Sequence, residues 1–260
     1  MDDQKQLQLN EKYYSVVAND IIRGKQKMSL REMQLLQLVI SQIAKNDTEL
    51  CIYTTTAIEL ARFLGIHKQS LYRDLDQITD KLMSRVIKIN VDGKYKKFNW
   101  LHICEYDPDT KKITLQLHDS LKPYLTALER FYSQIKIETV LSFKSYYALR
   151  LYQLLVCNWG ESGQSEYTLT IDQIRDFFQT EDKYKLNRDL LNKTIKPALA
   201  EINDSDYCII EDYTENHAKG KGAPIESVRF RVHLCKDAEY KKGILRASEI
   251  LQHLKTGDIE

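Results

Sequence analysis

The strongest constraint on the fold of this chain is an order of secondary-structure signals that occurs twice. The first occurrence predicts a helix over 29–44, a strand over 50–56, a helix over 57–64, a helix from Ser70, and strands over 86–91 and 97–106. Ser29 followed by Glu32 is typical of a capping box, which fixes the start of the first helix. Asp92-Gly93 predicts a tight hairpin turn between the last two strands.

The second occurrence predicts helices and strands in the same sequence order. It comprises a helix over 142–159, a strand over 167–170, a helix over 171–178, a helix from Lys185, and strands over 207–213 and 227–234. Residues 53–63 (YTTTAIELARF) align with 167–177 (YTLTIDQIRDF) at an offset of 114, and 73–75 align with 188–190 at 115. The sequence therefore predicts an α+β fold with two tandem winged-helix domains related by an internal repeat, over 1–137 and 138–260. A chance likeness between amphipathic helices remains the alternative.

Positive charge is gathered on two segments of a chain that is almost neutral. The 38 Lys and Arg against 37 Asp and Glu give a net charge of +1, so any attraction to a polyanion depends on local patches. Residues 183–196 carry five basic side chains against Asp189, and residues 217–231 carry four against Glu226. These segments are the third helix and the hairpin of the second predicted domain, the two elements with which a winged helix holds duplex DNA.

Helical periodicity divides the side chains of that third helix into two faces. Its predicted apolar face consists of Leu186, Leu190, Leu191, Thr194, Ala198, Leu199 and Ile202. The predicted DNA contacts are Lys183, Lys185, Asn187, Arg188, Asn192, Lys193 and Lys196 from the helix, with Lys219, Lys221 and Arg229 from the hairpin. Arg and Asn suit bidentate contacts with guanine and adenine. A solvated helix face with no ligand is the alternative.

Signals for catalysis, cofactors or a membrane are missing from the sequence. The six histidines are scattered and form no HExxH, and Gly220-Lys221-Gly222 lacks the rest of a phosphate-binding loop. The five cysteines form no CxxC pair, and Tyr146, Tyr147 and Tyr152 are expected in the core or at an interface. We therefore expect no enzyme, no catalytic residue, no metal and no cofactor. With no secretion signal or apolar span, we expect a cytoplasmic protein that does not enter a membrane.

Two segments carry a resemblance to a known family. Residues 141–155 (LSFKSYYALRLYQLL) followed by 195–203 (IKPALAEIN) resemble the iteron-binding plasmid replication initiators of the RepE and RepA type, and the likeness extends over about residues 17–234. The resemblance implies that the C-terminal winged helix makes the main contacts to directly repeated origin DNA. It further implies partnership with host replication proteins.

The resemblance also implies two roles for the N-terminal domain. It contacts DNA in the monomer, with Lys68, Gln69, Arg73 and Gln77 facing outward beside Asp74, Asp76 and Asp80, and it is the dimerisation domain when the protein represses its own gene. We expect Ile87, Ile89, Phe98, Trp100 and Ile103 to exceed what one small domain can cover and so to drive a homodimer in equilibrium with monomer. Pro197 is expected to kink the long third helix, with a simple helix break there as the alternative.

Two other functions remain open at this point. One is a dimeric winged-helix transcription regulator without a role at an origin. The other is a protein–protein scaffold whose basic faces bind acidic partners.

Overall fold

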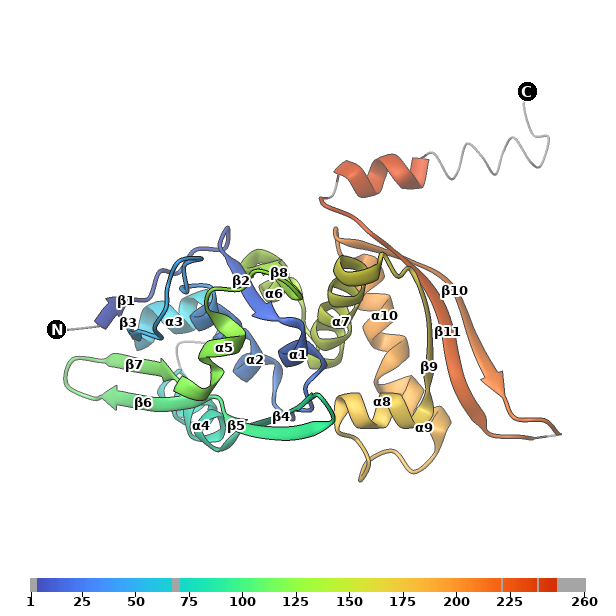
Figure 1. Cartoon of the computed structure of the whole chain (residues 1–260), viewed down its shortest axis with the longest axis horizontal. Helices are drawn as coiled ribbons and strands as arrows, with labels where there is room; N and C mark the ends of the chain where they lie inside the picture. The colour runs from blue at the N-terminus through green and yellow to red at the C-terminus, as the bar shows by residue number, and fades with distance from the viewer. Residues whose placement is uncertain (1–3, 67–70, 221, 238, 247–260) are drawn as a thin grey trace.

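The predicted architecture of two tandem winged helices is present. The computed structural model describes residues 4–66, 71–220, 222–237 and 239–246, with the backbone alone for 71–76. The two halves lie side by side, with the long helix α7 (Tyr146–Ser162) between them (Figure 1). Helix α7 packs on α1 and β8 of the first half and on α10 of the second. The predicted domain boundary at 137–138 therefore stays a prediction.

The first winged helix is built on a four-stranded sheet of order β1-β3-β7-β6. Its elements are β1 (Gln4–Gln6), α2 (Leu30–Ile40), β3 (Ile52–Thr56), α3 (Ala57–Phe63), α4 (Leu71–Ser84), β6 (Leu101–Asp107) and β7 (Lys112–Leu117). The predicted capping box is confirmed, because Ser29 Oγ accepts a hydrogen bond from the Glu32 amide at 3.3 Å while the Glu32 carboxylate accepts one from the Ser29 amide at 3.1 Å. Helix α2 is buried along nearly its whole length.

The second winged helix has a three-stranded sheet of order β10-β11-β9. With α7, its elements are β9 (Glu166–Thr170), α8 (Ile171–Phe178), α9 (Asn187–Lys193), α10 (Ile195–Asp204), β10 (Cys208–His217) and β11 (Ile225–Leu234). The wing formed by β10 and β11 extends away from the body (Figure 1). Tyr152 is buried, and Tyr146 and Tyr147 are partly buried against the core, as predicted.

The internal repeat is confirmed at the level of strand register and helix caps. Strand β3 pairs with β7, which brings Tyr53 opposite Leu115, and β9 pairs with β11, which brings Tyr167 opposite Phe230. Thr56 and Thr170, separated by the offset of 114 seen in the sequence, each form a capping box at the start of the next helix. Hydrogen bonds within a few residues fix these helix starts, so a local sequence match predicts them.

The predicted wing of the first half is wrong. Residues 97–106 do not form one strand: β4 (Val86–Val91) pairs with β5 (Lys94–Asn99) in a separate two-stranded sheet, and the chain then bends at the buried Trp100 into β6. The wing is the hairpin of β6 and β7, because β7 is the strand that pairs with β3. The turn at Asp92-Gly93 is present with positive φ at both residues, but it closes an additional ribbon that has no counterpart in the second half.

The expected surplus of apolar surface is contradicted for three of the five residues named for it, while Phe98 and Ile103 are half-buried. Ile87, Ile89 and Trp100 are fully buried within the single chain. The two isoleucines are covered by α1 (Asn19–Arg23) and the glycine that follows it, since a Cβ on Gly24 would lie 2.9 Å from side-chain atoms of both. A close backbone approach therefore buries these residues without a second copy.

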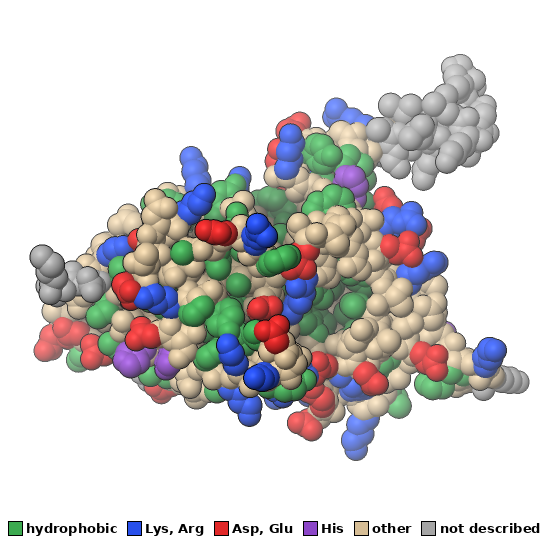
Figure 2. Space-filling model, viewed as in Figure 1, with side chains coloured by type: hydrophobic (Ala, Val, Ile, Leu, Met, Phe, Trp, Pro, Cys, Tyr) green, Lys and Arg blue, Asp and Glu red, His purple; other side chains and the backbone are tan. Residues whose placement is uncertain are grey.

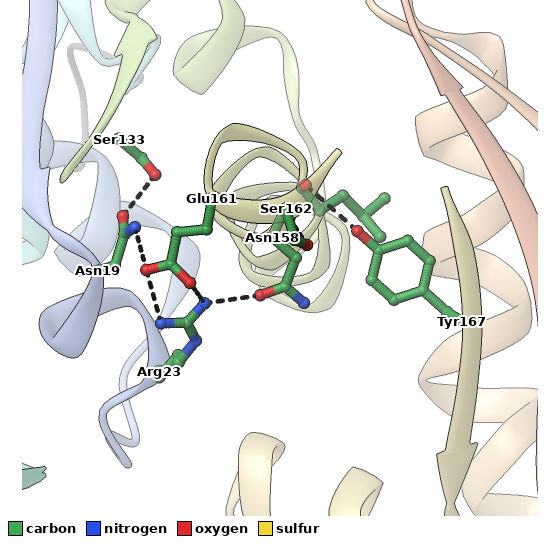
Figure 3. Close-up of polar contacts among 8 residues, drawn as sticks. Asn19, Arg23, Ser133, Asn158, Glu161, Ser162 and Tyr167 are labelled. Carbon is green, nitrogen blue, oxygen red and sulfur yellow. Dashed lines mark hydrogen bonds and ion pairs between the residues drawn. The ribbon is translucent and has the colours of Figure 1, made fainter. Parts of the chain in front are cut away.

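Further elements of the first half connect it to α7. They are β2 (Tyr14–Ala18), which pairs with β8 (Tyr132–Lys136), the 3-10 helix η1 (Asp119–Leu121), α5 (Lys122–Leu125) and α6 (Ile137–Ser142). Polar side chains join α1 to α7 (Figure 3). Asn19 donates to Glu161 at 2.6 Å, and Arg23 binds Glu161 and donates to Asn158 at 2.9 Å. The hydrogen bond from Arg23 holds the pKa of Glu161 below its usual range, so the pair stays charged at neutral pH.

Arg150 in the middle of α7 forms a second, buried connection between the halves. Its guanidinium is fully buried, donates to the Gly24 carbonyl at 3.0 Å and lies over the Phe177 ring at 4.5 Å. Burial lowers the pKa of Arg150. This residue of the segment 141–155 is therefore a packing residue that orients the second winged helix on the first.

Candidate nucleic-acid interface

The turn that leads into α9 is organised by one arginine of α8. Arg175 donates to the carbonyls of Lys183 at 2.9 Å and Tyr184 at 2.8 Å, and to Asn187 Oδ1 at 3.2 Å. Asn187 in turn donates to the Ile225 carbonyl of β11 at 2.9 Å. The first turn of α9 is therefore held in place from both α8 and the wing.

Sequence reasoning missed Arg175 because a basic residue on an amphipathic helix is usually a solvated one. The alignment of the two halves could have drawn attention to Arg175, since the first half has Ala61 at the corresponding position. Alanine has no side-chain donor to bind the carbonyls of a turn. The two helix–turn–helix segments therefore differ at this residue despite their common fold.

Five of the predicted contact residues share one exposed surface. Lys183 and Lys185 lie in the turn, and Arg188, Asn192 and Lys193 lie on the outer face of α9. All five side chains are exposed, and none has a hydrogen bond or ion pair to another residue in the described part of the chain. We define these five as the α9 surface. Unpaired cations on a helix and on the turn that precedes it, beside a wing, are available to bind phosphates and base edges.

Three features of the predicted third helix are wrong. Asn187 does not point freely outward, because its half-buried side chain bonds to Arg175 and Ile225, and its DNA contact stays a prediction. Leu186 does not face the core: it is 65% exposed beside the α9 surface. The helix is not kinked at Pro197 but interrupted at Thr194, whose φ and ψ are −124° and −75°. Pro197 therefore lies in the first turn of α10, where a backbone N–H has no hydrogen-bond acceptor within the helix and can be absent at no cost.

Lys196 is separated from the α9 surface by that interruption. Its Nζ lies 2.6 Å from a carboxylate oxygen of Glu215 on β10, so part of its charge is neutralised within the chain. The same ion pair lowers the pKa of Glu215. A DNA contact by Lys196 stays a prediction that would require it to exchange partners.

A groove of about 690 Å³ separates the start of α9 from the wing. Residues 185–188 line one side, and the other side includes His217, Gly220, Ala223 and Pro224. Lys219 is exposed at the tip of the wing. Arg229 lies on the outer face of β11, 4.0 Å from Glu166 on β9. Lys221 lies outside the described residues.

The predicted contacts of the first half are only partly described. Lys68 and Gln69 lie outside the described residues, and for Arg73 the structure gives a place on α4 but no side chain. Gln77 is exposed on the same helix. Their role stays a prediction.

The described residues contain neither a metal-binding cluster nor a membrane-spanning helix. No group of three His, Cys, Asp or Glu side chains in them could hold a metal ion. In the same residues no helix has the length and apolarity needed to cross a membrane.

Comparison with known proteins assigns the chain to a family. Residues 15–156 match the family model described as Initiator Replication protein, WH1, and residues 170–232 match the model described as Initiator Rep protein, WH2. A structure similar to this one is the Pi initiator protein in complex with iteron DNA, with a TM-score of 0.67 and 16% identity over 88% of this chain and 100% of that chain. At this identity the likeness supports the shared fold. Because the WH1 model alone matches more than half of the sequence, the chain belongs to the Initiator Replication protein family, as its resemblance to plasmid initiators predicted.

Proposed function

We propose that this chain is a plasmid replication initiator that binds directly repeated, double-stranded origin DNA through the α9 surface. The observation that carries the proposal is the group of unpaired cations on α9 and its preceding turn, facing the wing across an open groove. The fold is also that of an initiator whose structure contains iteron DNA. In this arrangement α9 enters the major groove and the wing, through Lys219, follows the phosphate backbone.

The first winged helix is proposed as the secondary DNA contact and the second as the main reader, with 1–137 and 138–260 as their extents. One chain would then place two winged helices on successive grooves of a single repeat. A direct repeat has no two-fold symmetry, so a monomer matches it better than a symmetric dimer does.

Footprinting of the purified protein on the DNA beside its coding region tests this function. We expect protection of tandem direct repeats at intervals that match one chain per repeat. Protection of an inverted repeat alone would favour a transcription regulator without an origin role, and protection of neither would favour a protein–protein scaffold.

We further propose that the protein represses its own gene as a dimer and starts replication, with host replication proteins, as a monomer. Symmetry supports assigning repression to the dimer, because an inverted-repeat operator has the same two-fold symmetry as a dimer. Ile87, Ile89 and Trp100 are buried within the single chain, so the dimer surface has to be formed by other residues of the first half. Ultracentrifugation combined with gel shifts on both sites should give dimer on the operator and monomer on one repeat. A protein that stays dimeric on one repeat, or never dimerises at micromolar concentration, would contradict the switch.

We also propose that the chain acts by binding, in the cytoplasm, without cleaving DNA or hydrolysing ATP. A tyrosine that attacks DNA needs a metal or base beside its hydroxyl, and the tyrosines of α7 are instead buried or partly buried against the core. Supercoiled origin DNA incubated with the protein and Mg²⁺ should remain supercoiled. Nicked circles that depend on the protein would overturn this proposal.

A further inference from the structure

The ribbon of β4 and β5 carries a row of like charges in strand register. Lys88 of β4 lies directly opposite Lys97 of β5. On the other side, Lys25 forms an isolated bridge with Lys88, with amide-to-carbonyl hydrogen bonds of 2.8 and 2.9 Å in the two directions. Directly paired residues project from the same face of a sheet, so the three lysines form one row.

This row lies on the outer face of the ribbon. Ile87 and Ile89, the neighbours of Lys88 along β4, are fully buried on the inner face. The outer face also carries Tyr95 opposite Asn90, and Lys88 Nζ lies 4.0 Å from the centre of the Tyr95 ring. Lysine, asparagine and tyrosine are side chains that donate to phosphate oxygens.

Acidic side chains neutralise only part of the positive charge of this lysine row. Lys25 forms an ion pair with Asp176 of α8. Lys88 and Lys97 have no acidic partner within the described residues. Like charges directly opposite each other destabilise a pair of strands, so the row has a cost in the free protein that an anionic ligand would remove.

The ribbon lies between the helices that the two halves offer to DNA. Strands β4 and β5 run along the lower edge of the molecule, with α4 to one side and α8 and α9 to the other (Figure 1). Lysine and arginine side chains gather over the same edge (Figure 2). The ion pair from Lys25 to Asp176 joins the row directly to α8, the helix that precedes the α9 surface.

We propose that the outer face of the β4–β5 ribbon is a third DNA-binding surface, which holds the phosphate backbone between the segments contacted by the two winged helices. This inference rests on the proposed function, because it takes its ligand to be the same duplex. Contacts to phosphate position the protein and carry no sequence information. The ribbon therefore contributes affinity and salt dependence, while base recognition stays with α9.

Lysines on an exposed strand have another use, which is to prevent edge-to-edge pairing with a second chain. That role needs charge anywhere along β5. The DNA-binding role needs charge on the outer face. The two roles therefore predict different results when the two faces are neutralised separately.

The test compares two double variants of equal charge in the same ribbon. Lys88→Gln with Lys97→Gln neutralises the outer face. Lys94→Gln with Lys96→Gln is the matched control, because these two lysines pair with Val91 and Ile89 on the inner face, and Lys96 lies 3.4 Å from the Tyr124 hydroxyl. Binding is measured as a function of salt on a full direct repeat and on a scrambled duplex of the same length.

The outer-face variant should flatten the plot of log affinity against log salt by about 1 to 2 units on both duplexes, since each lost phosphate contact accounts for about 0.9. Its ratio of repeat to scrambled affinity should be unchanged, and its melting temperature should be equal to or above that of the wild type. The inner-face variant should change the slope by well under half as much.

Equal slope changes in the two variants would mean that only the total charge of the ribbon matters, whichever face carries it, and would overturn the proposal. An unchanged slope in the outer-face variant would remove the ribbon from the interface while leaving the α9 surface intact. If the wild type does not prefer the repeat, the proposed function is wrong, and the slopes on the scrambled duplex still decide whether the ribbon holds phosphates.

Discussion

Replacing Arg188 with alanine is expected to weaken binding to the direct repeat by roughly 1–3 kcal/mol, or about 5- to 150-fold, with little change on random duplex. Arg188 lies in the first turn of α9, exposed and without a partner among the described residues, and Asn187 beside it is fixed by Arg175 and β11. Recognition helices contact base edges with their N-terminal residues, and an arginine there binds guanine with two hydrogen bonds. Gel shifts on repeat and scrambled duplexes measure both affinities.

Arg188→Lys is the matched control for this prediction. Lysine keeps the positive charge but lacks the planar pair of donors. The Arg188→Lys variant should therefore lose most of its preference for the repeat and keep its affinity for random duplex. If Arg188→Ala weakened both duplexes equally, and Arg188→Lys restored both, Arg188 would be a phosphate contact instead.

Replacing Phe230 with alanine is expected to lower the free energy of unfolding of the second winged helix by roughly 3–5 kcal/mol. Phe230 is fully buried on β11 and stacks on Tyr167 of β9 with ring centroids 5.5 Å apart and planes 11° apart. The Tyr167 hydroxyl lies 3.3 Å from the Leu155 carbonyl of α7 and 3.1 Å from the Gln164 carbonyl that precedes β9, so Tyr167 joins the sheet to the end of that helix. The cavity left by the ring would lie at this junction.

Urea denaturation followed by circular dichroism, with hydrogen exchange of the β9 and β11 amides, measures this loss. Arg231→Ala is the control on the next residue of the same strand, which faces solvent and makes ion pairs only at 3.5 and 3.6 Å with Glu166 and Asp212. It should change stability by within about 0.5 kcal/mol. A loss below about 1 kcal/mol for Phe230→Ala would contradict the packing described here.

Several features of the interface followed from the sequence because they depend on neighbours along the chain. Arg188, Asn192 and Lys193 were placed on an outer helix face by helical periodicity, and the structure has them exposed on α9. Leu186 was misplaced because α9 begins at Asn187, so helical periodicity does not apply to Leu186. Asn187 lies three and four residues before the buried Leu190 and Leu191, which places it on the inner side of α9. Arg175 and β11, which fix that start, are distant in sequence.

The sequence by itself determined the internal repeat, the helix starts at Ser29, Thr56 and Thr170, and the turn at Asp92-Gly93, because each depends on residues a few positions apart. Only the tertiary structure decided which hairpin is the first wing, since β7 pairs with β3 although α3, α4 and β4 to β6 lie between them in the sequence. It also decided that Gly24 lets α1 cover Ile87 and Ile89, and that Lys196 pairs with Glu215. Burial and pairing between distant segments depend on the whole packed chain, and no local pattern of residues contains that information.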